Sequence, residues 1–192
     1  MFDCEILVNK NNRLPFNFMP QELIEIPRKY EFETKEYISK LVYEKFLELR
    51  KEALANGINI FIDNAYRSNL AQIKIFKYFV GKIGLSATLK RVAIPGCSEH
   101  QTGLAMDLGV IKDNKSVKIT EEEAKFLEDN AYKYGFILRY PKGKEEITGY
   151  QYEPWHFRYV GEDLALYLKE SGLTLEEYYL EKNREQNVQL VK

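Results

Sequence analysis

Two histidines and an aspartate are the residues of this chain whose types and spacing suit metal chemistry. His100 and His156 are its only histidines, and Asp107 follows His100 by seven residues. Catalytic zinc takes three protein ligands, commonly histidine nitrogens and carboxylate oxygens, and keeps a fourth position for water. These three side chains meet that count. Spacing alone leaves a second reading open, because a histidine is more often a surface or satisfied core residue than a ligand.

Glu153 is the candidate general base beside such a site. A carboxylate near zinc can take a proton from water and pass it on. Residues three apart on a regular strand point to opposite faces, so Glu153 and His156 would diverge. Pro154 lies between them, and proline in a sheet is usual at an edge or a bulge. We therefore expect a bend that brings both side chains to one site; a solvated strand charge is the alternative.

Four other residues adjoin these candidates. Arg67 follows an isoleucine-rich segment, and its planar fork suits a carboxylate ligand, although a plain surface arginine is the alternative. Arg158 is expected on the same strand face as His156, where it could equally pair with a carboxylate. Cys97 is expected to be a small buried residue rather than a nucleophile. Trp155 belongs to an aromatic run that is core by default, and it can also wall a pocket.

Helices are predicted on both sides of these residues. Apolar residues recur at three- and four-residue spacing from Ile38 to Ala53 and again from 70 to 83. Ser68 is the expected N-cap of the second helix, and Gly84 lies just beyond its end. Thr120 and Glu123 form a capping-box pattern that predicts a further helix, and two last helices begin near residues 162 and 174.

Strands are predicted in the middle of the chain. Residues 58–62 alternate, and residues 104–109 place apolar side chains on one face and small ones with Asp107 on the other. Residues 136–140 and 150–159 are aromatic-rich and can form one hairpin. Helices first, strands next and helices last predict an α+β fold with a small central antiparallel sheet and flanking helices.

Composition sets the broad class. The 192 residues are 45% apolar, which excludes disorder, and 28 basic against 29 acidic residues give a net charge of −1. Such a balance gives no broad attraction to nucleic acid or to an anionic membrane. Two cysteines build no disulfide scaffold. We expect one domain over 1–192, with an extended N-terminal arm (1–33) and a core (34–192).

Two features that the sequence lacks, a long apolar segment and the pattern of a signal peptide, indicate where in the cell to expect the protein. A membrane span needs about 20 apolar residues, and the apolar runs here are far shorter, so we expect no stable membrane insertion. The first residues carry neither the basic nor the apolar region of a signal peptide, so we expect a cytoplasmic protein. The sequence does not indicate the oligomeric state.

Taken together, the motifs resemble those of the zinc D-Ala-D-Ala carboxypeptidases and dipeptidases of the VanY, VanX and VanXY type. The pattern Ser-x-His-x-x-Gly-x-Ala-x-Asp runs from Ser98 to Asp107, and Glu-x-x-His runs from Glu153 to His156. The likeness extends over about 66–161 and is greatest to the VanXY branch. It implies the hedgehog-like fold of these metallopeptidases and a small peptide substrate ending in D-Ala-D-Ala.

The resemblance also implies roles for individual residues. Zinc would lie on His100, Asp107 and His156, with Glu153 as the base. Arg67 would contribute to catalysis and to substrate binding. The other residues implied near the substrate are Gln72, Ser98 and Trp155. Two rivals remain: an L,D-carboxypeptidase that trims D-Ala from tetrapeptides, and a zinc-bearing binding module without catalysis.

Overall fold

A five-stranded antiparallel sheet lies at the centre of the computed structural model, which describes residues 4–20, 22–27 and 35–190. Its strands run in the order β3-β4-β7-β6, and β5 pairs with β4. Their bounds are β3 Ile60–Asn64, β4 Ala105–Lys112, β5 Lys115–Val117, β6 Phe136–Leu138 and β7 His156–Tyr159. The predicted α+β class with a small antiparallel sheet is confirmed.

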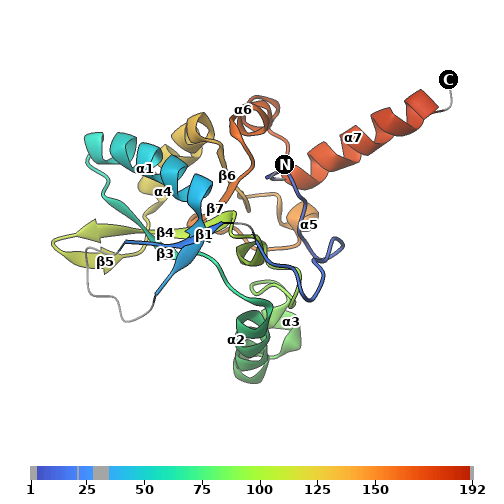
Figure 1. The fold of residues 1–192 in the computed structure, drawn as a ribbon, viewed down its shortest axis with the longest axis horizontal. Coiled ribbons are helices and arrows are strands. Elements are labelled where there is room, and N and C mark those ends of the chain that lie inside the picture. The colour runs from blue at the N-terminus through green and yellow to red at the C-terminus, as the bar shows by residue number, and fades with distance from the viewer. Residues whose placement is uncertain (1–3, 21, 28–34, 191–192) are drawn as a thin grey trace.

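Helices lie on both sides of this sheet (Figure 1). In that view α1, α4 and α6 lie above the strands, α2 and α3 lie below them, and α7 extends outward toward the C-terminus. Their bounds are α1 Lys40–Ala55, α2 Asn69–Ile83, α3 Leu85–Thr88, α4 Glu121–Asn130, α5 Glu145–Thr148, α6 Glu162–Ser171 and α7 Leu175–Leu190. None of the helices in the described ranges is long and apolar enough to cross a bilayer.

The predicted helix caps form as expected. The Ser68 hydroxyl accepts a hydrogen bond from the Ala71 amide at 3.2 Å and so starts α2. Thr120 and Glu123 form a reciprocal capping box at the start of α4. Each cap satisfies amides that have no partner within the helix, which is why these boundaries follow from local sequence.

The main core lies between the sheet and α1. Met106 and Leu108 of β4 are buried against Val42, Phe46 and Leu49 of α1. Asp107, between the two β4 residues, points to the opposite face, as the alternation predicted. Burial of one face of β4 therefore fixes the direction of a candidate ligand on the other.

Residues 150–159 do not form one strand, contrary to the prediction. Strand β7 begins only at His156, and α5 lies in the connection from β6. Pro154 and Trp155 form a turn in which the His156 amide donates to the Glu153 carbonyl at 3.1 Å. Proline offers no amide for a ladder, so the aromatic alternation before it does not become strand. Only 136–138 and 156–159 pair as the expected hairpin.

The N-terminal region also differs from the prediction. Strand β1 (Leu23–Glu25) pairs with β2 (Tyr37–Ser39), so Ile38, expected in the first helix, lies in a strand. The expected boundary between arm and core, at 33/34, falls outside the described residues. A two-residue turn at Asp113 and Asn114, both with positive φ, joins β4 to β5 and was not predicted.

Candidate active site

The three candidate metal ligands converge on one point of the sheet. Asp107 of β4 and His156 of β7 are directly opposed residues of adjacent strands. His100 comes from a 3-10 turn, Glu99–Thr102, that precedes β4. One ligand atom from each side chain lies within 4.8 Å of the others. Sequence spacing predicted this group, and the structure brings all three residues together.

Hydrogen bonding leaves the ring nitrogen of His100 that faces Asp107 available as a ligand. The Nδ1 atom of His100 lies 2.7 Å from the Ala65 carbonyl oxygen. A carbonyl can only accept, so Nδ1 carries the proton and Nε2 keeps its lone pair. Nε2 lies 3.4 Å from Asp107 Oδ1. Burial lowers the pKa of His100, which favours the neutral form that a metal requires.

His156 is oriented in the same way by a carboxylate, Glu99. Its Nε2 lies 3.3 Å from Glu99 Oε2, and its Nδ1 lies 3.0 Å from Asp107 Oδ1. Burial lowers the pKa of His156, but hydrogen bonds to Asp107 and Glu99 outweigh it and raise the pKa to about 9. Glu99 therefore holds the ring with Nδ1 toward the ligand cluster, an outer hydrogen bond typical of metal-binding histidines.

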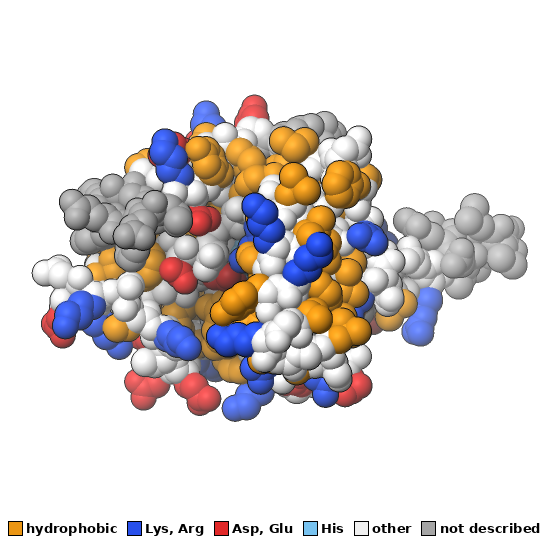
Figure 2. Space-filling model, turned by 90° about the horizontal axis from the view of Figure 1, so that it is seen from below, with side chains coloured by type: hydrophobic (Ala, Val, Ile, Leu, Met, Phe, Trp, Pro, Cys, Tyr) orange, Lys and Arg blue, Asp and Glu red, His pale blue; other side chains and the backbone are white. Residues whose placement is uncertain are grey.

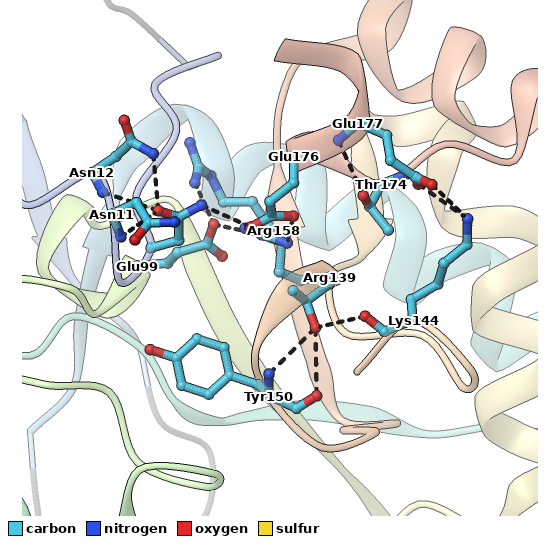
Figure 3. Close-up of polar contacts among 12 residues, drawn as sticks. Asn11, Asn12, Glu99, Arg139, Lys144, Tyr150, Arg158, Thr174, Glu176 and Glu177 are labelled. Atoms are coloured by element: carbon cyan, nitrogen blue, oxygen red, sulfur yellow. Dashed lines mark hydrogen bonds and ion pairs between the residues drawn. The ribbon is translucent and has the colours of Figure 1, made fainter. Parts of the chain in front are cut away.

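Glu99 is kept ionised by two buried arginines (Figure 3). Arg139 Nε and Arg158 Nη1 donate to its Oε1 at 2.7 and 2.8 Å, and all three side chains are fully buried. Burial alone would raise the pKa of Glu99; the two guanidinium groups outweigh it and hold the pKa well below its usual range. Arg139 also pairs with Glu176 in α7, so this helix is tied to the site through one arginine.

Glu153 shares a cavity with the ligand cluster. The turn at Pro154 places Glu153 on the lining of a cavity of about 220 Å³ that also contains His100, Asp107 and His156. Burial raises the pKa of Glu153 to about 7, against the opposing effects of His156 and Arg67. A carboxylate with such a pKa is a stronger base than an ordinary glutamate and exchanges protons near neutral pH.

Arg67 and Gln72 lie in the same cavity as a fixed pair. Arg67 Nη1 donates to Gln72 Oε1 at 3.1 Å, and Gln72 Nε2 donates to the Ala93 carbonyl at 2.7 Å. The Arg67 amide donates to the His100 carbonyl at 3.0 Å, which ties it to the ligand turn. The guanidinium group is thus held beside the ligand cluster, with donors left for an anionic group.

Of the remaining candidate residues, Ser98 and Trp155 also line this cavity. Ser98 is buried, and Trp155 is 40% exposed. Cys97 is buried, as predicted. Arg158 lies on the same face as His156 and pairs with a carboxylate, Glu99, which was the alternative given for it; it lies outside the cavity lining.

Two residues of the site were not predicted. Glu99 occupies a variable position of the Ser98–Asp107 pattern; two arginines in aromatic-rich segments (Arg139 and Arg158) signal a buried acid, although not which one. Tyr150 was assigned to the core, yet it lines the cavity, and its buried hydroxyl has no hydrogen-bond partner among the described residues. A polar substrate group is a natural partner for that hydroxyl.

Comparison with known families agrees with the geometry. The family model "VanY: D-alanyl-D-alanine carboxypeptidase" matches residues 35–162. The chain belongs to this family. It is 42% identical to YodJ of Bacillus subtilis (strain 168), which is named as a carboxypeptidase, over 180 residues, which are 90% of this chain and 66% of YodJ.

A second relative matches over nearly its whole length. The bifunctional D-Ala-D-Ala dipeptidase and D-Ala-D-Ala carboxypeptidase VanXYC of Enterococcus gallinarum is 37% identical over 178 residues, 90% of this chain and 92% of that protein. The predicted family resemblance is thereby confirmed.

Solved structures share the fold. The LD-carboxypeptidase LdcB has a TM-score of 0.80 at 42% identity, covering 90% of this chain and 84% of that one. A vancomycin-resistance D,D-pentapeptidase VanY from a VanB-type cassette, in complex with Zn(II), has a TM-score of 0.77 at 34% identity, covering 93% and 99%. These two neighbours are therefore an LD-carboxypeptidase and a D,D-pentapeptidase.

The donor set of this chain fits a zinc ion. It consists of two histidine nitrogens and one carboxylate oxygen, each histidine having its other ring nitrogen already bound. Three such ligands with a cavity beside them are typical of a catalytic rather than a structural zinc site.

Proposed function

We propose that this protein is a zinc metallopeptidase that hydrolyses D-Ala-D-Ala termini of peptidoglycan precursors, in the manner of glycopeptide-resistance enzymes. It would act as a D,D-carboxypeptidase, a D,D-dipeptidase or both. The observation that carries the proposal is the meeting of the ligand cluster, Glu153 and Arg67 in one cavity. Family membership and the activities named for VanXYC support the substrate class.

The metal would be held by His100 Nε2, Asp107 and His156 Nδ1. A bound zinc ion supplies Lewis-acid chemistry, polarising the scissile carbonyl and making water more acidic. Every other step falls to side chains of the protein. Glu99 keeps His156 in the ligating orientation through the bond to Nε2.

Glu153 would move the proton. As a carboxylate it accepts a proton from the attacking water, whose oxygen bonds to the carbonyl carbon of the scissile amide. The same proton then passes to the nitrogen of the leaving D-Ala as the C–N bond breaks. A binding module without catalysis has no need of a half-buried carboxylate with a raised pKa in this position.

Arg67 would bind the terminal carboxylate of the substrate. Its fork gives two parallel hydrogen bonds to a carboxylate, and Gln72 fixes the direction of that fork. We assign Ser98 and Tyr150 to polar contacts with the peptide, and Trp155 to the wall of the cavity. Arg67→Lys should therefore weaken substrate binding much as Arg67→Ala does, because an ammonium group lacks the planar fork.

An L,D-carboxypeptidase is the second candidate, favoured by the likeness to LdcB. Hydrolysis should be measured, as release of the terminal D-Ala or D-lactate, on four substrates: D-Ala-D-Ala, a pentapeptide ending in it, a D-Ala-D-lactate depsipeptide and a tetrapeptide ending in an L-residue and D-Ala. We expect zinc-dependent cleavage of the dipeptide, the pentapeptide or both. Cleavage of the tetrapeptide alone would establish the L,D-activity, and cleavage of none would favour the binding module.

Location is part of the proposal and is tested separately. We propose that the enzyme meets its substrates in the cytosol, where free D-Ala-D-Ala and precursors ending in it are made. Fractionation of native cells, with activity assayed in each fraction, tests this. Recovery of the protein outside the membrane would contradict the location and leave the peptidase chemistry unaffected.

A further inference from the structure

Helix α2 carries apolar side chains that the fold does not bury. Nine of its 15 residues are apolar, yet the two residues of this helix that are buried, Asn69 and Gln72, are polar. Among the described residues, neither apolar core cluster contains a member of α2. Leu70 and Tyr78 are 63% and 60% exposed, and Leu85 in the adjoining α3 is 54% exposed. An apolar helix that stays half-exposed indicates a surface that binds a partner.

The same segment is strongly basic. Residues 65–98 contain six basic residues and no acidic one, although the whole chain has a net charge of −1. Five of the six are exposed: Lys74, Lys77, Lys82, Lys90 and Arg91. The sixth, Arg67, lines the cavity. The charge balance of the chain therefore conceals a local positive surface, and the remainder of the molecule is acidic.

These two properties coincide on one face of the molecule. Helices α2 and α3 lie at the bottom of Figure 1 and therefore face the viewer in Figure 2. There, orange apolar and blue basic side chains are mixed over the centre and right of the molecule, whereas red acidic ones lie to the left of this region and at the upper and lower edges. We call this face the α2–α3 surface, defined by Leu70, Lys74, Lys77, Tyr78, Lys82, Leu85, Lys90 and Arg91.

We propose that the α2–α3 surface docks the protein on an anionic lipid bilayer. On α2, exposed Leu70 and Tyr78 are interleaved with lysines, and a second exposed leucine, Leu85, begins α3. This is the pattern of an interfacial segment, which inserts apolar side chains among headgroups while lysines meet anionic lipid. Charge complementarity decides between occupants. A second copy of this chain would bring two basic faces together, and like charges across an interface are unfavourable. The contact is peripheral and adds no membrane span.

Docking by this surface would bring the cavity to the membrane. Gln72, Ile75 and Phe79 of α2 line the cavity, as does Arg91, so the helix that docks also forms one wall of the site. A precursor attached to lipid would then be presented near the ligand cluster. That consequence rests on the proposed function, whereas bilayer binding does not and can be measured without any substrate.

Cosedimentation with vesicles tests the electrostatic part. The full chain should bind vesicles of equal phosphatidylglycerol and phosphatidylcholine, bind pure phosphatidylcholine much less, and be released by about 0.5 M salt, at which exposed charges are screened. The triple variant Lys74→Gln/Lys77→Gln/Lys82→Gln should bind about 100-fold more weakly, at roughly fivefold per lysine near an anionic surface. None of these lysines lines the cavity.

Matched variants control for net charge and for apolar surface. Lys51→Gln/Lys115→Gln/Lys142→Gln removes three exposed lysines from other elements and should bind like the native protein. Leu70→Gln/Leu85→Gln should weaken binding at least tenfold. Leu54→Gln/Leu180→Gln, which changes leucines 54% and 57% exposed elsewhere, should not. Circular dichroism and thermal melting confirm that each variant is folded.

Three results would overturn the proposal. The first is equal binding to anionic and neutral vesicles, or binding to neither. The second is equal loss of binding in the α2–α3 lysine variant and its matched control. The third is a native dimer, seen by sedimentation equilibrium, that Leu70→Gln/Leu85→Gln dissociates, which would make this face a contact between copies instead.

Discussion

At the scale of single residues, Glu153 is placed where its own charge is unfavourable. Burial raises its pKa from 4.5 to about 7. The folded state therefore binds a proton that the unfolded state has released between these two values. The resulting decrease in the free energy of unfolding is absent below pH 4.5 and complete above pH 7. In metal-free protein, Glu153→Gln should thus raise the free energy of unfolding by about 1 to 3 kcal/mol at pH 8, and by nothing at pH 4.

Denaturant unfolding of chelated protein at both pH values measures this difference. Glu44→Gln changes an exposed carboxylate on α1 and should stay within about 0.5 kcal/mol of the native protein at either pH. The zinc-loaded Glu153→Gln enzyme should lose about 10²–10⁴-fold in turnover. A variant that is less stable at pH 8 would show that Glu153 is a structural carboxylate.

We expect Glu99 to act on the metal through His156. The effect of replacing Glu99 should therefore be measured as a change in metal affinity. Glu99→Gln should weaken Zn²⁺ or Co²⁺ binding about 10- to 100-fold, because the outer hydrogen bond that orients the ring is weakened. It also leaves the buried Arg158 without a carboxylate and Arg139 with Glu176 alone, so stability falls by about 3 to 5 kcal/mol.

Glu176→Gln separates these two effects. Glu176 pairs with Arg139 and makes no contact with His156. This variant should therefore be destabilised like Glu99→Gln while its metal affinity, titrated under native conditions, stays within twofold of the native value. Equal affinities for both variants would mean that Glu99 serves the fold and does not position His156.

At the scale of elements, Gly103 sets the distance from the His100 turn to the Asp107 strand. It adopts φ of +71°, and an added Cβ would lie 2.9 Å from Leu23 Cδ2 and 3.5 Å from the Ser39 amide nitrogen. Gly103→Ala should lower the free energy of unfolding by about 2 to 4 kcal/mol and weaken metal binding. Gly57, with φ of +80° and no atom near its Cβ position, isolates the backbone effect, so Gly57→Ala should lose only about 1 to 2 kcal/mol. Equal decreases in the free energy of unfolding for the two variants would mean that β1 shifts to accommodate the added methyl group at residue 103.

Elements with local signals were predictable, and those that depend on distant partners were not. Ser68 and Thr120 satisfy amides within three residues, so the starts of α2 and α4 could be read from sequence. Strands β1 and β5 have three residues each and form only because another strand pairs with them. The aromatic alternation before Pro154 imitated a strand, although those residues pack around a turn. A bend at Pro154 was nevertheless expected, and this turn places Glu153 on the lining of the cavity.

At the scale of the whole molecule, the overall composition of the chain predicted less about its surface than the positions of the charged residues along the sequence did. A net charge of −1 concealed the basic α2–α3 surface, because acidic residues elsewhere in the chain balance it. The metal ligands were candidates from their residue types and spacing, and the family resemblance implied the full set; the register of β4 with β7 then places Asp107 opposite His156. Glu99 could not be predicted, because the direction of a side chain on a 3-10 turn depends on which cations are buried around it. Those cations, Arg139 just after β6 and Arg158 in β7, lie 40 and 59 residues further along the chain.

Zinc should stabilise the whole molecule because its ligands are joined only in the native fold. A ligand that binds the native state alone contributes RT ln(1 + [L]/Kd), which is about 2.7 kcal/mol when free zinc is 100 times Kd. For a domain of this size, 1 kcal/mol shifts Tm by roughly 2 to 4 °C, so chelation should lower Tm by about 5 to 10 °C. Asp107→Asn should melt at the same temperature with and without zinc, since it loses the carboxylate on which both histidines converge. Asp113→Asn, in the exposed β4–β5 turn, should keep the full zinc-dependent shift. A shift that persists in Asp107→Asn would place the stabilising ion at another site, whatever the enzyme's activity.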